Sequence, residues 1–255
     1  MRSTVLCRAN RKGLVLGWLL SLASALACVA GGSGPDRTTA PTRPVPAVLF
    51  DGRSVQGLRG YGQAVFPEDA WRVGEGRLST VPGRPVDLVT EVDFASFELI
   101  ARWAVSPGGN SGLIYRVTES EHPAWTSGAE YQIVDDERHP DGLDPRTSTA
   151  SLYGLLPPSA DRILHPAGEM NESRVVVVGS CVEHWLNGVP VLRYRWDEPE
   201  LRRLIGRSKF RDWPSFMAAE SGSIVLQHHG ELVSFTWVEV RQRADGGADA
   251  RCSGA

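Results

Sequence analysis

Hydrophobic and polar residues alternate in short runs along most of the chain, which is the pattern of strands that bury one face. Gly, Pro, Asn and Asp separate the runs, and no long stretch keeps a 3.6-residue period. One short helix is predicted over residues 199–206. Strands are predicted over residues 97–103, 112–117, 131–134, 151–155, 174–178, 182–186, 189–194, 222–228 and 233–240.

Asn187-Gly188 is the strongest short turn signal, because both residues tolerate the positive φ that a two-residue hairpin turn requires. Many short strands joined by turns, without an internal repeat, indicate an all-β fold. We expect a two-sheet antiparallel β-sandwich.

The first 27 residues have the pattern of a secretory signal peptide. Four basic residues and no acidic one come with an apolar run that ends in Ala25-Leu26-Ala27-Cys28. Cys28 stands where a lipoprotein cysteine would, so lipidation at Cys28 and plain cleavage after Ala27 are both open. The expected location is the periplasm or, through a lipid anchor, the membrane of a bacterium.

Beyond the leader, composition divides the chain into three parts. Residues 28–47 are rich in Gly, Ser, Thr and Pro and are expected to be a disordered tether. Residues 48–243 carry the strand pattern and are expected to form the folded domain. Residues 244–255 are rich in Gly and Ala and are expected to be a disordered tail.

Charge narrows the class of ligand. The 255 residues have a formal net charge of −3, which falls to −7 once the leader is removed with its four basic side chains. An acidic domain does not favour an anionic polymer, so nucleic acid is not an expected partner.

The cysteines left after export allow two alternatives. Cys181 lies in a predicted hairpin and Cys252 in the tail. An oxidising compartment permits a bridge between them, and a buried free thiol at Cys181 is the other interpretation.

Several familiar catalytic sites are absent from the sequence. There is no G-x-S-x-G elbow, no H-E-x-x-H, no C-x-x-C, no P-loop and no G-x-G-x-x-G motif. Residues 91–93 begin like the E-x-D-x-x-E strand of laminarinases, but Ser96 stands where the second glutamate belongs. Retaining glycoside hydrolysis needs two carboxylates at one bond, so that interpretation is not favoured.

The densest polar cluster covers residues 130–141 (EYQIVDDERHPD). On a strand, Glu130 and Gln132 share one face while Tyr131 and Ile133 share the other. Carboxylates with imidazole serve proton transfer or metal binding, whereas a solvated strand face with a polar loop is the structural alternative. At residues 227–229, Gln227 and His229 point to the same side.

Several short segments occur in a characteristic order: 49–52 (LFDG), 109–116 (GNSGLIYR), 130–136 with 139–141, 151–155 (SLYGL), 168–172 (GEMNE), 182–188 (VEHWLNG), 208–210 (SKF) and 222–230 (GSIVLQHHG). This order resembles the 3-keto-disaccharide hydrolase domain family. The resemblance covers nearly all of residues 48–241, although this chain has Met170 where the family usually has Trp and His228 where it usually has Asp.

The resemblance implies a concanavalin-like or laminin-G-like jelly roll that acts on glycosides already oxidised at C3. A C3 ketone acidifies the hydrogen on C2, so a base can remove it, the enolate can expel the aglycone from C1, and water can add to the product. Such a protein needs a base, an acid and a group that holds the enolate charge.

The resemblance also gives the candidate site residues. Glu130, Asp135, His139 and His229 are the candidates for proton transfer, and the first three are also the candidate ligands of a divalent metal ion, which would stabilise an enolate. Candidates for binding the sugar are Asn110, Arg116, Gln132, Tyr153, Lys209 and Gln227. Lys209 is the only lysine outside the leader.

Two other classes of function compete with this one. A β-sandwich can be a carbohydrate-binding module without catalysis, with Trp125 or Trp213 as stacking residues, since jelly rolls serve both purposes. A structural surface lipoprotein would neither bind nor cleave sugar. In either enzyme or module, the expected partner is a small carbohydrate.

Overall fold

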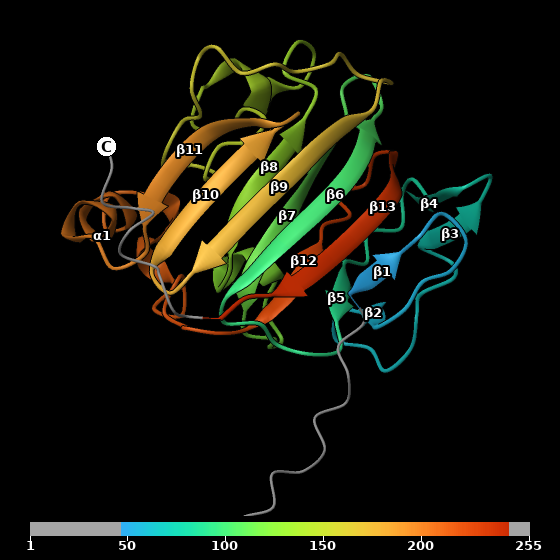
Figure 1. The fold of residues 1–255 in the computed structure, drawn as a ribbon, viewed down its shortest axis with the longest axis horizontal. Coiled ribbons are helices and arrows are strands. Elements are labelled where there is room, and N and C mark those ends of the chain that lie inside the picture. The colour runs from blue at the N-terminus through green and yellow to red at the C-terminus, as the bar shows by residue number, and fades with distance from the viewer. Residues whose placement is uncertain (1–46, 245–255) are drawn as a thin grey trace, which may run out of the picture. The chain divides into compact units, whose positions relative to one another are not determined.

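The computed structural model describes residues 47–244, which form two antiparallel sheets packed face to face (Figure 1). The predicted sandwich is therefore confirmed. The predicted signal peptide with Cys28, most of the tether and most of the tail lie outside the described residues.

The larger sheet has eight strands in the order β11-β10-β9-β6-β13-β4-β3, with β1 added beside β13. Its strands are β1 (Val48–Phe50), β3 (Trp71–Gly74), β4 (Arg77–Thr80), β6 (Phe97–Val105), β9 (Asn171–Val178), β10 (Cys181–Leu186), β11 (Val189–Arg195) and β13 (Val233–Gln242).

The smaller sheet has five strands in the order β2-β5-β12-β7-β8. Its strands are β2 (Leu58–Gly60), β5 (Leu88–Thr90), β7 (Asn110–Val117), β8 (Ala129–Val134) and β12 (Ser223–Leu226). The helices are α1 (Pro199–Ile205) and the single 3-10 turns η1 (Ala124–Thr126), η2 (Pro140–Leu143) and η3 (Lys209–Asp212). No helix in residues 47–244 is long and apolar enough to cross a membrane.

The core lies between the sheets and is filled by alternate residues of each strand. Tyr131 and Ile133 of β8 are fully buried there, as the alternation predicts, and Trp103, Phe97 and Phe235 join them from the larger sheet. Full burial of a side chain of this size stabilises the fold by roughly 1.5–3 kcal/mol.

A hydrogen-bonded chain of polar side chains crosses this core. His184 Nδ1 donates to the carbonyl of Ala150 at 2.9 Å, so its Nε2 accepts from the Tyr115 hydroxyl at 2.7 Å, and the Tyr194 hydroxyl lies 2.6 Å from that of Tyr115. Burial lowers the pKa of His184 to about 4, so the ring is neutral at pH 7. His184 is thus a packing residue.

The predictions of local structure are confirmed at one turn and one helix and are wrong at one strand. Asn187 and Gly188 join β10 to β11 with φ values of 48° and 81°, which a two-residue hairpin turn requires. The helix predicted over residues 199–206 is α1. The strand predicted over residues 151–155 is wrong, because Ala150 and Gly154 both have φ of 71° and Leu152 makes only isolated bridges.

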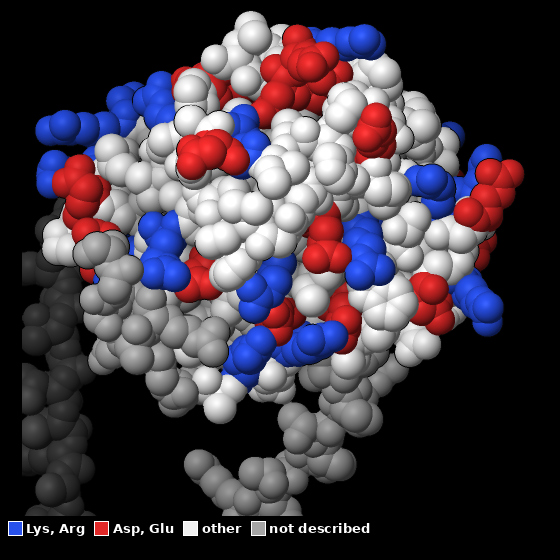
Figure 2. Space-filling view, turned by 45° about the horizontal axis from the view of Figure 1, so that its top comes forward, with Lys and Arg blue, Asp and Glu red and all other residues white. Residues whose placement is uncertain are grey.

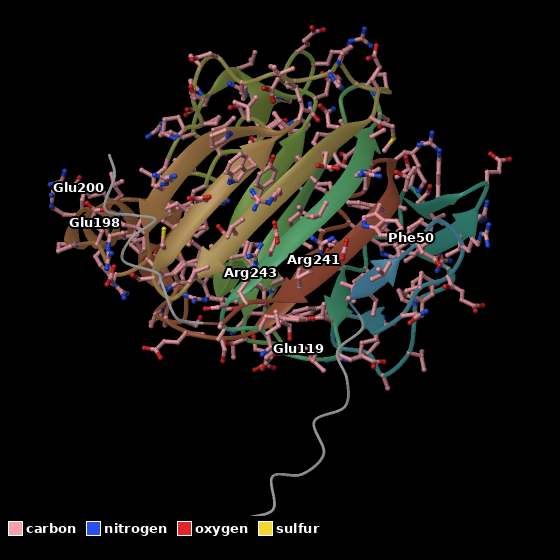
Figure 3. All side chains as sticks on the ribbon, viewed as in Figure 1. Phe50, Glu119, Glu198, Glu200, Arg241 and Arg243 are labelled. Carbon is pink, nitrogen blue, oxygen red and sulfur yellow. The ribbon has the colours of Figure 1, made fainter. Side chains whose placement is uncertain are left out.

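Charged side chains cover the outer face of the larger sheet. Figure 2 shows basic and acidic residues interspersed over it, and Figure 3 places Arg241 and Arg243 near the end of β13 on this face. Neighbouring strands are linked by ion pairs, among them Arg174 with Glu98, Arg243 with Glu98, Arg102 with Glu172 and Arg193 with Glu183.

Cys181 begins β10 and is disulfide-bonded, so the alternative of a free buried thiol is wrong. Cys252, the partner considered from the sequence, lies outside the described residues.

Candidate active site

The outer face of the smaller sheet, behind β9 and β6 in Figure 1, carries two cross-strand rows of side chains. Strand register gives the first row as Val89, Val225, Ile114 and Glu130. The same register, continued by two residues, gives the second row as Asp87, Gln227, Gly112 and Gln132. One apolar row thus ends in a carboxyl group, beside a row that is polar except for a glycine.

The side chain of Glu130 lies over Gly112, and it fits there because glycine has a hydrogen atom in place of a side chain. A Cβ atom at residue 112 would lie 2.3 Å from Glu130 Oε1, which is closer than atoms in contact can approach. The residue is 7% exposed, and this burial raises the pKa of Glu130 to about 8, with Asp87 and Asp141 adding to the rise and Lys209 opposing it. Glu130 therefore titrates near neutral pH, as a proton-transfer group must.

Asp141 connects the loop after β8 to the site. Its Oδ2 accepts a hydrogen bond from the Tyr153 hydroxyl at 3.0 Å and from Asn110 Nδ2 at 3.4 Å. Its charge also acts on both Glu130 and Lys209. Three residues that sequence analysis assigned to sugar binding are thereby brought to one place.

Lys209 lies against three aromatic rings. Its Nζ is 4.2 Å from the ring centroid of Tyr153, 5.1 Å from that of Trp125 and 5.2 Å from that of Phe210. Desolvation lowers the pKa of Lys209, while Glu130 and Asp141 raise it. Rings and carboxylates together hold a cation next to Glu130.

Three amide side chains of this face are incompletely bonded. Among residues 47–244, Asn110 Oδ1, Gln132 Nε2 and Gln227 Oε1 are buried without a hydrogen-bond partner. Buried polar atoms are nearly always paired in folded proteins. Two acceptors and one donor on this face are therefore left with unused hydrogen-bonding capacity.

An open pocket of about 440 Å³ adjoins this cluster. Asp87, Gln227 and His229 form its polar side, and Trp125, Tyr61 and Pro123 form an apolar wall. A sugar ring with an apolar face and a polar edge matches such a lining.

The two histidines assigned from the sequence lie together at this site. The rings of His139 and His229 are 6.2 Å apart and nearly perpendicular. His139 Nδ1 accepts the backbone N–H of Asp141 at 3.1 Å, so the neutral ring carries its proton on Nε2. His139 can donate a hydrogen bond through Nε2.

Asp135 does not join Glu130. Its carboxylate accepts hydrogen bonds from the N–H groups of Gly108 at 2.7 Å and Glu137 at 3.1 Å, where it fixes two loops. Asp135 is separated from Glu130 because successive side chains of a strand point to opposite faces, which places Asp135 on the same side as Tyr131.

Arg116 lies outside the cluster as well. Its guanidinium stacks on Trp196 at 4.7 Å and donates to the carbonyls of Ala95 and Gly179, on the far side of β7 from Glu130. The φ of Arg116 is 54°, which breaks the alternation of β7.

The proposed ligands of a divalent metal do not fit one. Glu130 and Asp135 lie on opposite sides of their strand, and the carboxylate of Asp135 and Nδ1 of His139 already accept backbone N–H groups. In the part of the chain that the structure describes, no three His, Cys, Asp or Glu side chains gather closely enough to hold a metal ion.

Sequence reasoning assigned no role to two residues of this site. Asp141 belongs to the polar segment 139–141, so its signal was present. Asp87 precedes a three-residue strand that the pattern did not reveal, and only strand register brings it beside Gln227.

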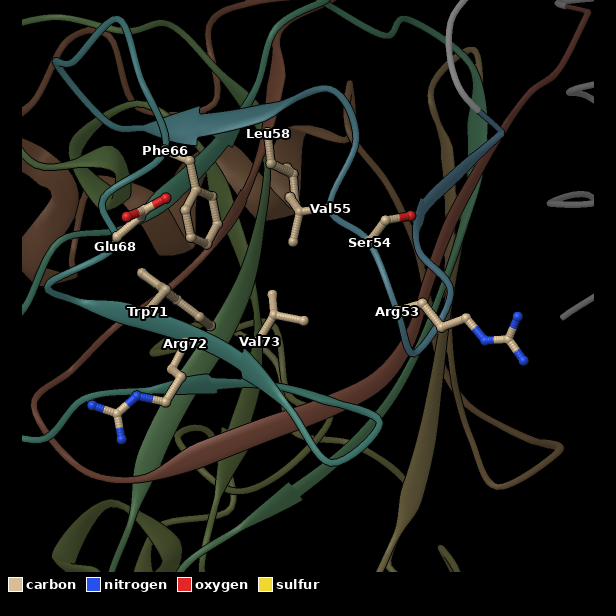
Figure 4. Close-up of a pocket in the computed structure, with 9 residues that line it drawn as sticks. All are labelled: Arg53, Ser54, Val55, Leu58, Phe66, Glu68, Trp71, Arg72 and Val73. Atoms are coloured by element: carbon tan, nitrogen blue, oxygen red, sulfur yellow. The ribbon is translucent and has the colours of Figure 1, made fainter.

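A larger hollow lies elsewhere, between β2, β3 and the loop that follows β1 (Figure 4). Val55, Leu58 and Phe66 face it, whereas Arg53 and Arg72 extend away from it. Glu68 is the one carboxylate among its lining residues, and no second carboxylate or histidine lines the hollow beside it, so it is a poor candidate for catalysis.

Two solved structures share this fold. A putative glycosyl hydrolase from Parabacteroides distasonis superposes with a TM-score of 0.71 at 26% identity, covering 77% of this chain and 93% of that one. A second putative glycosyl hydrolase from the same species gives a TM-score of 0.60 at 22% identity, over 74% of this chain and all of that one.

A curated relative is similar in sequence. The 3-keto-disaccharide hydrolase of Bacteroides thetaiotaomicron is 32% identical over 226 residues, which span 76% of this chain and 77% of that protein. The family model described as the 3-keto-alpha-glucoside-1,2-lyase-like domain matches residues 46–241. These matches confirm the resemblance found in the sequence motifs, and the chain belongs to the 3-keto-alpha-glucoside-1,2-lyase-like family.

Proposed function

We propose that this chain cleaves glycosides whose sugar is oxidised to a ketone at C3, by removal of the C2 proton, loss of the aglycone from C1 and addition of water. Membership of the family supports a glycoside-cleaving enzyme. The observation that carries the proposal is the buried Glu130 carboxyl, whose pKa of about 8 suits proton transfer and which shares a sheet face with three amides that each leave one buried atom unpaired.

The neighbouring residues supply the other needs of this chemistry. The ammonium of Lys209 offers a positive charge to the oxygen of the enolate. Gln132, Gln227 and Asn110 offer donors and acceptors to the sugar hydroxyls, and Trp125 offers an apolar face. His139 offers a hydrogen bond from Nε2 at the edge of the pocket.

Buried titrating groups favour catalysis over binding alone. A carbohydrate-binding module needs aromatic faces and hydroxyl partners, but it gains nothing from a carboxyl group held protonated beside a lysine. Burial of that carboxyl has a cost in folding free energy, and strongly perturbed pKa values cluster at functional sites.

The test is release of sugar from a 3-keto-glucoside, with the unoxidised glucoside as the control substrate. We expect cleavage of the keto sugar alone, and loss of turnover in Glu130→Ala and His139→Ala. Glu200→Ala, at an exposed ion pair with Arg203 on helix α1 (Figure 3), is the matched control and keeps full activity. Binding of the keto sugar without release would favour the binding module, and full activity of both site variants would refute the assignment. The same assay with a chelator tests separately for a metal.

We also propose that the protein is exported. The leader pattern of residues 1–27 supports this location, and so does the disulfide at Cys181, since disulfides persist in oxidising compartments. Cell fractionation with mass measurement of the mature N-terminus tests export and shows whether Cys28 carries lipid.

A further inference from the structure

Asp87 lies at one end of the polar row that contains Gly112, the residue on which the Glu130 side chain packs. It directly precedes β5, and the pairing of Leu88 with Leu226 places it next to Gln227. Gln227 in turn hydrogen-bonds through its N–H to the carbonyl of Gly112. Two carboxyl groups thus face the same side of the sheet, with Gln227 between them.

The Asp87 carboxylate is held at one oxygen and open at the other. Its Oδ1 accepts the backbone N–H of His228 at 2.7 Å. Within residues 47–244, Oδ2 has no hydrogen-bond partner, and the half-buried side chain lines the pocket beside Gln227 and His229. An oriented carboxylate with one free oxygen in a pocket is suited to accept a proton from a bound molecule.

The two carboxyl groups differ in charge at neutral pH. Burial raises the pKa of Asp87 to about 6, against the opposing effects of the His228 N–H and the His229 ring. Burial raises the pKa of Glu130 further, to about 8. Between these values Asp87 is ionised while Glu130 carries a proton, and a pair separated in this way divides into a base and an acid.

We propose that Asp87 is the second catalytic carboxylate of this site and removes the C2 proton, while Glu130 protonates the departing oxygen. This inference rests on the proposed function. In the first half-reaction the proton on C2 passes to Asp87, the C1–O bond breaks, and the leaving oxygen takes the proton of Glu130. The products are a 3-keto sugar with a C1–C2 double bond and a free alcohol.

The second half-reaction restores both groups. Glu130, now ionised, takes a proton from water as the water oxygen bonds to C1. Asp87, now protonated, returns its proton to C2. The sum is hydrolysis without net oxidation, and each carboxyl group ends in its starting state.

The roles can be separated with two substrates that share the 3-keto sugar, a methyl glycoside and a 4-nitrophenyl glycoside. Methoxide needs an acid in order to leave, whereas nitrophenolate does not. We expect Asp87→Asn, which keeps the acceptor for the His228 N–H, to lower kcat by ~10²–10⁴ on both substrates. We expect Glu130→Gln to lower kcat as much on the methyl glycoside but by less than about tenfold on the nitrophenyl glycoside.

A control and an independent readout complete the design. Asp69→Asn, at an exposed surface ion pair with Arg84, should match the wild type. Exchange of the C2 hydrogen in D₂O, followed by NMR on a 3-keto sugar without a leaving group, should persist in Glu130→Gln and vanish in Asp87→Asn. This readout does not depend on cleavage.

The outcomes distinguish failure of the inference from failure of the proposed function. If the wild type cleaves both substrates while Asp87→Asn stays within twofold of it, or if Asp87→Asn spares only the nitrophenyl substrate, the role of Asp87 is refuted and the proposed function stands. If the wild type cleaves neither substrate, the proposed function fails and the inference fails with it.

Discussion

Gly112→Ala adds one methyl group to the site and should disable it without unfolding the protein. The new Cβ would lie 2.3 Å from Glu130 Oε1, whereas ordinary contacts begin near 3.4 Å, so the carboxyl group must move by about 1 Å. A displacement of that size in a catalytic group costs on the order of 10²-fold in rate. The atoms that must move are Oε1, Cδ and Cγ of one side chain and no backbone atom, and Gly112 does not have a positive φ. We therefore expect the free energy of unfolding to change by no more than about 1 kcal/mol.

The assay is kcat on a 3-keto-glucoside together with thermal unfolding of the same sample. Gly74→Ala is the matched control, because a Cβ there meets nothing within 4 Å and the φ of Gly74 is not positive either. The control should keep both rate and Tm. A Gly112→Ala protein with an unchanged Tm and wild-type kcat would refute the claim that the placement of Glu130 over Gly112 matters for catalysis.

Three further results are expected from the pKa shifts. Since the pKa of Glu130 is raised to about 8, folding binds a proton between pH 4.5 and 8, and stability falls as pH rises through that range; Glu130→Gln should therefore raise Tm more at pH 9 than at pH 5. Lys209 lowers the pKa of Glu130, so Lys209→Met should move the alkaline limb of the kcat/KM profile to higher pH. Since the pKa of His184 is lowered to about 4, the wild type should lose roughly 3 kcal/mol from this residue as pH falls from 6.5 to 4, and urea unfolding of His184→Gln should show a flatter pH dependence.

The hydrophobic pattern predicted the face on which each side chain lies wherever the alternation along a strand is regular. On β8, the two-residue period separates Tyr131 and Ile133 in the core from Glu130 and Gln132 on the other face, and the structure confirms that division. Asn187-Gly188 likewise specifies its own turn. In these places the geometry depends on residues within a few positions of one another.

The pattern failed where the backbone departs from that period. At Arg116 a positive φ inserts an irregularity into β7, so Val117 instead of Arg116 joins Ile114 on the outer face. The pairing of β12 with β7 shifts register at the same point. The sequence around Arg116 contains no signal for a β-bulge, because the neighbouring strands impose this backbone conformation.

Two features of the site depend on contacts between distant segments. Asp87 and Glu130 are 43 positions apart, and only the order β5-β12-β7-β8 places them on one face. The burial of Glu130 is also non-local, since a polar strand residue facing outward is ordinarily solvated. The sequence therefore pointed to Glu130, but its raised pKa and its carboxylate neighbour follow from the assembled sheet.

The same assembly explains why this sheet face costs folding free energy. Each buried polar atom without a partner costs roughly 1–3 kcal/mol, and among the described residues Gln132, Gln227 and Asn110 each leave one such atom on this face. A protein selected for stability alone would replace these amides with apolar residues, as Val89, Val225 and Ile114 already show in the next row. Under the proposed function, a sugar that supplies the missing hydrogen bonds would offset this cost, and the site would discriminate strongly against molecules that lack the hydroxyl groups. The unpaired amide atoms of Gln132, Gln227 and Asn110 thus lie on the one sheet face that carries Glu130 and Asp87.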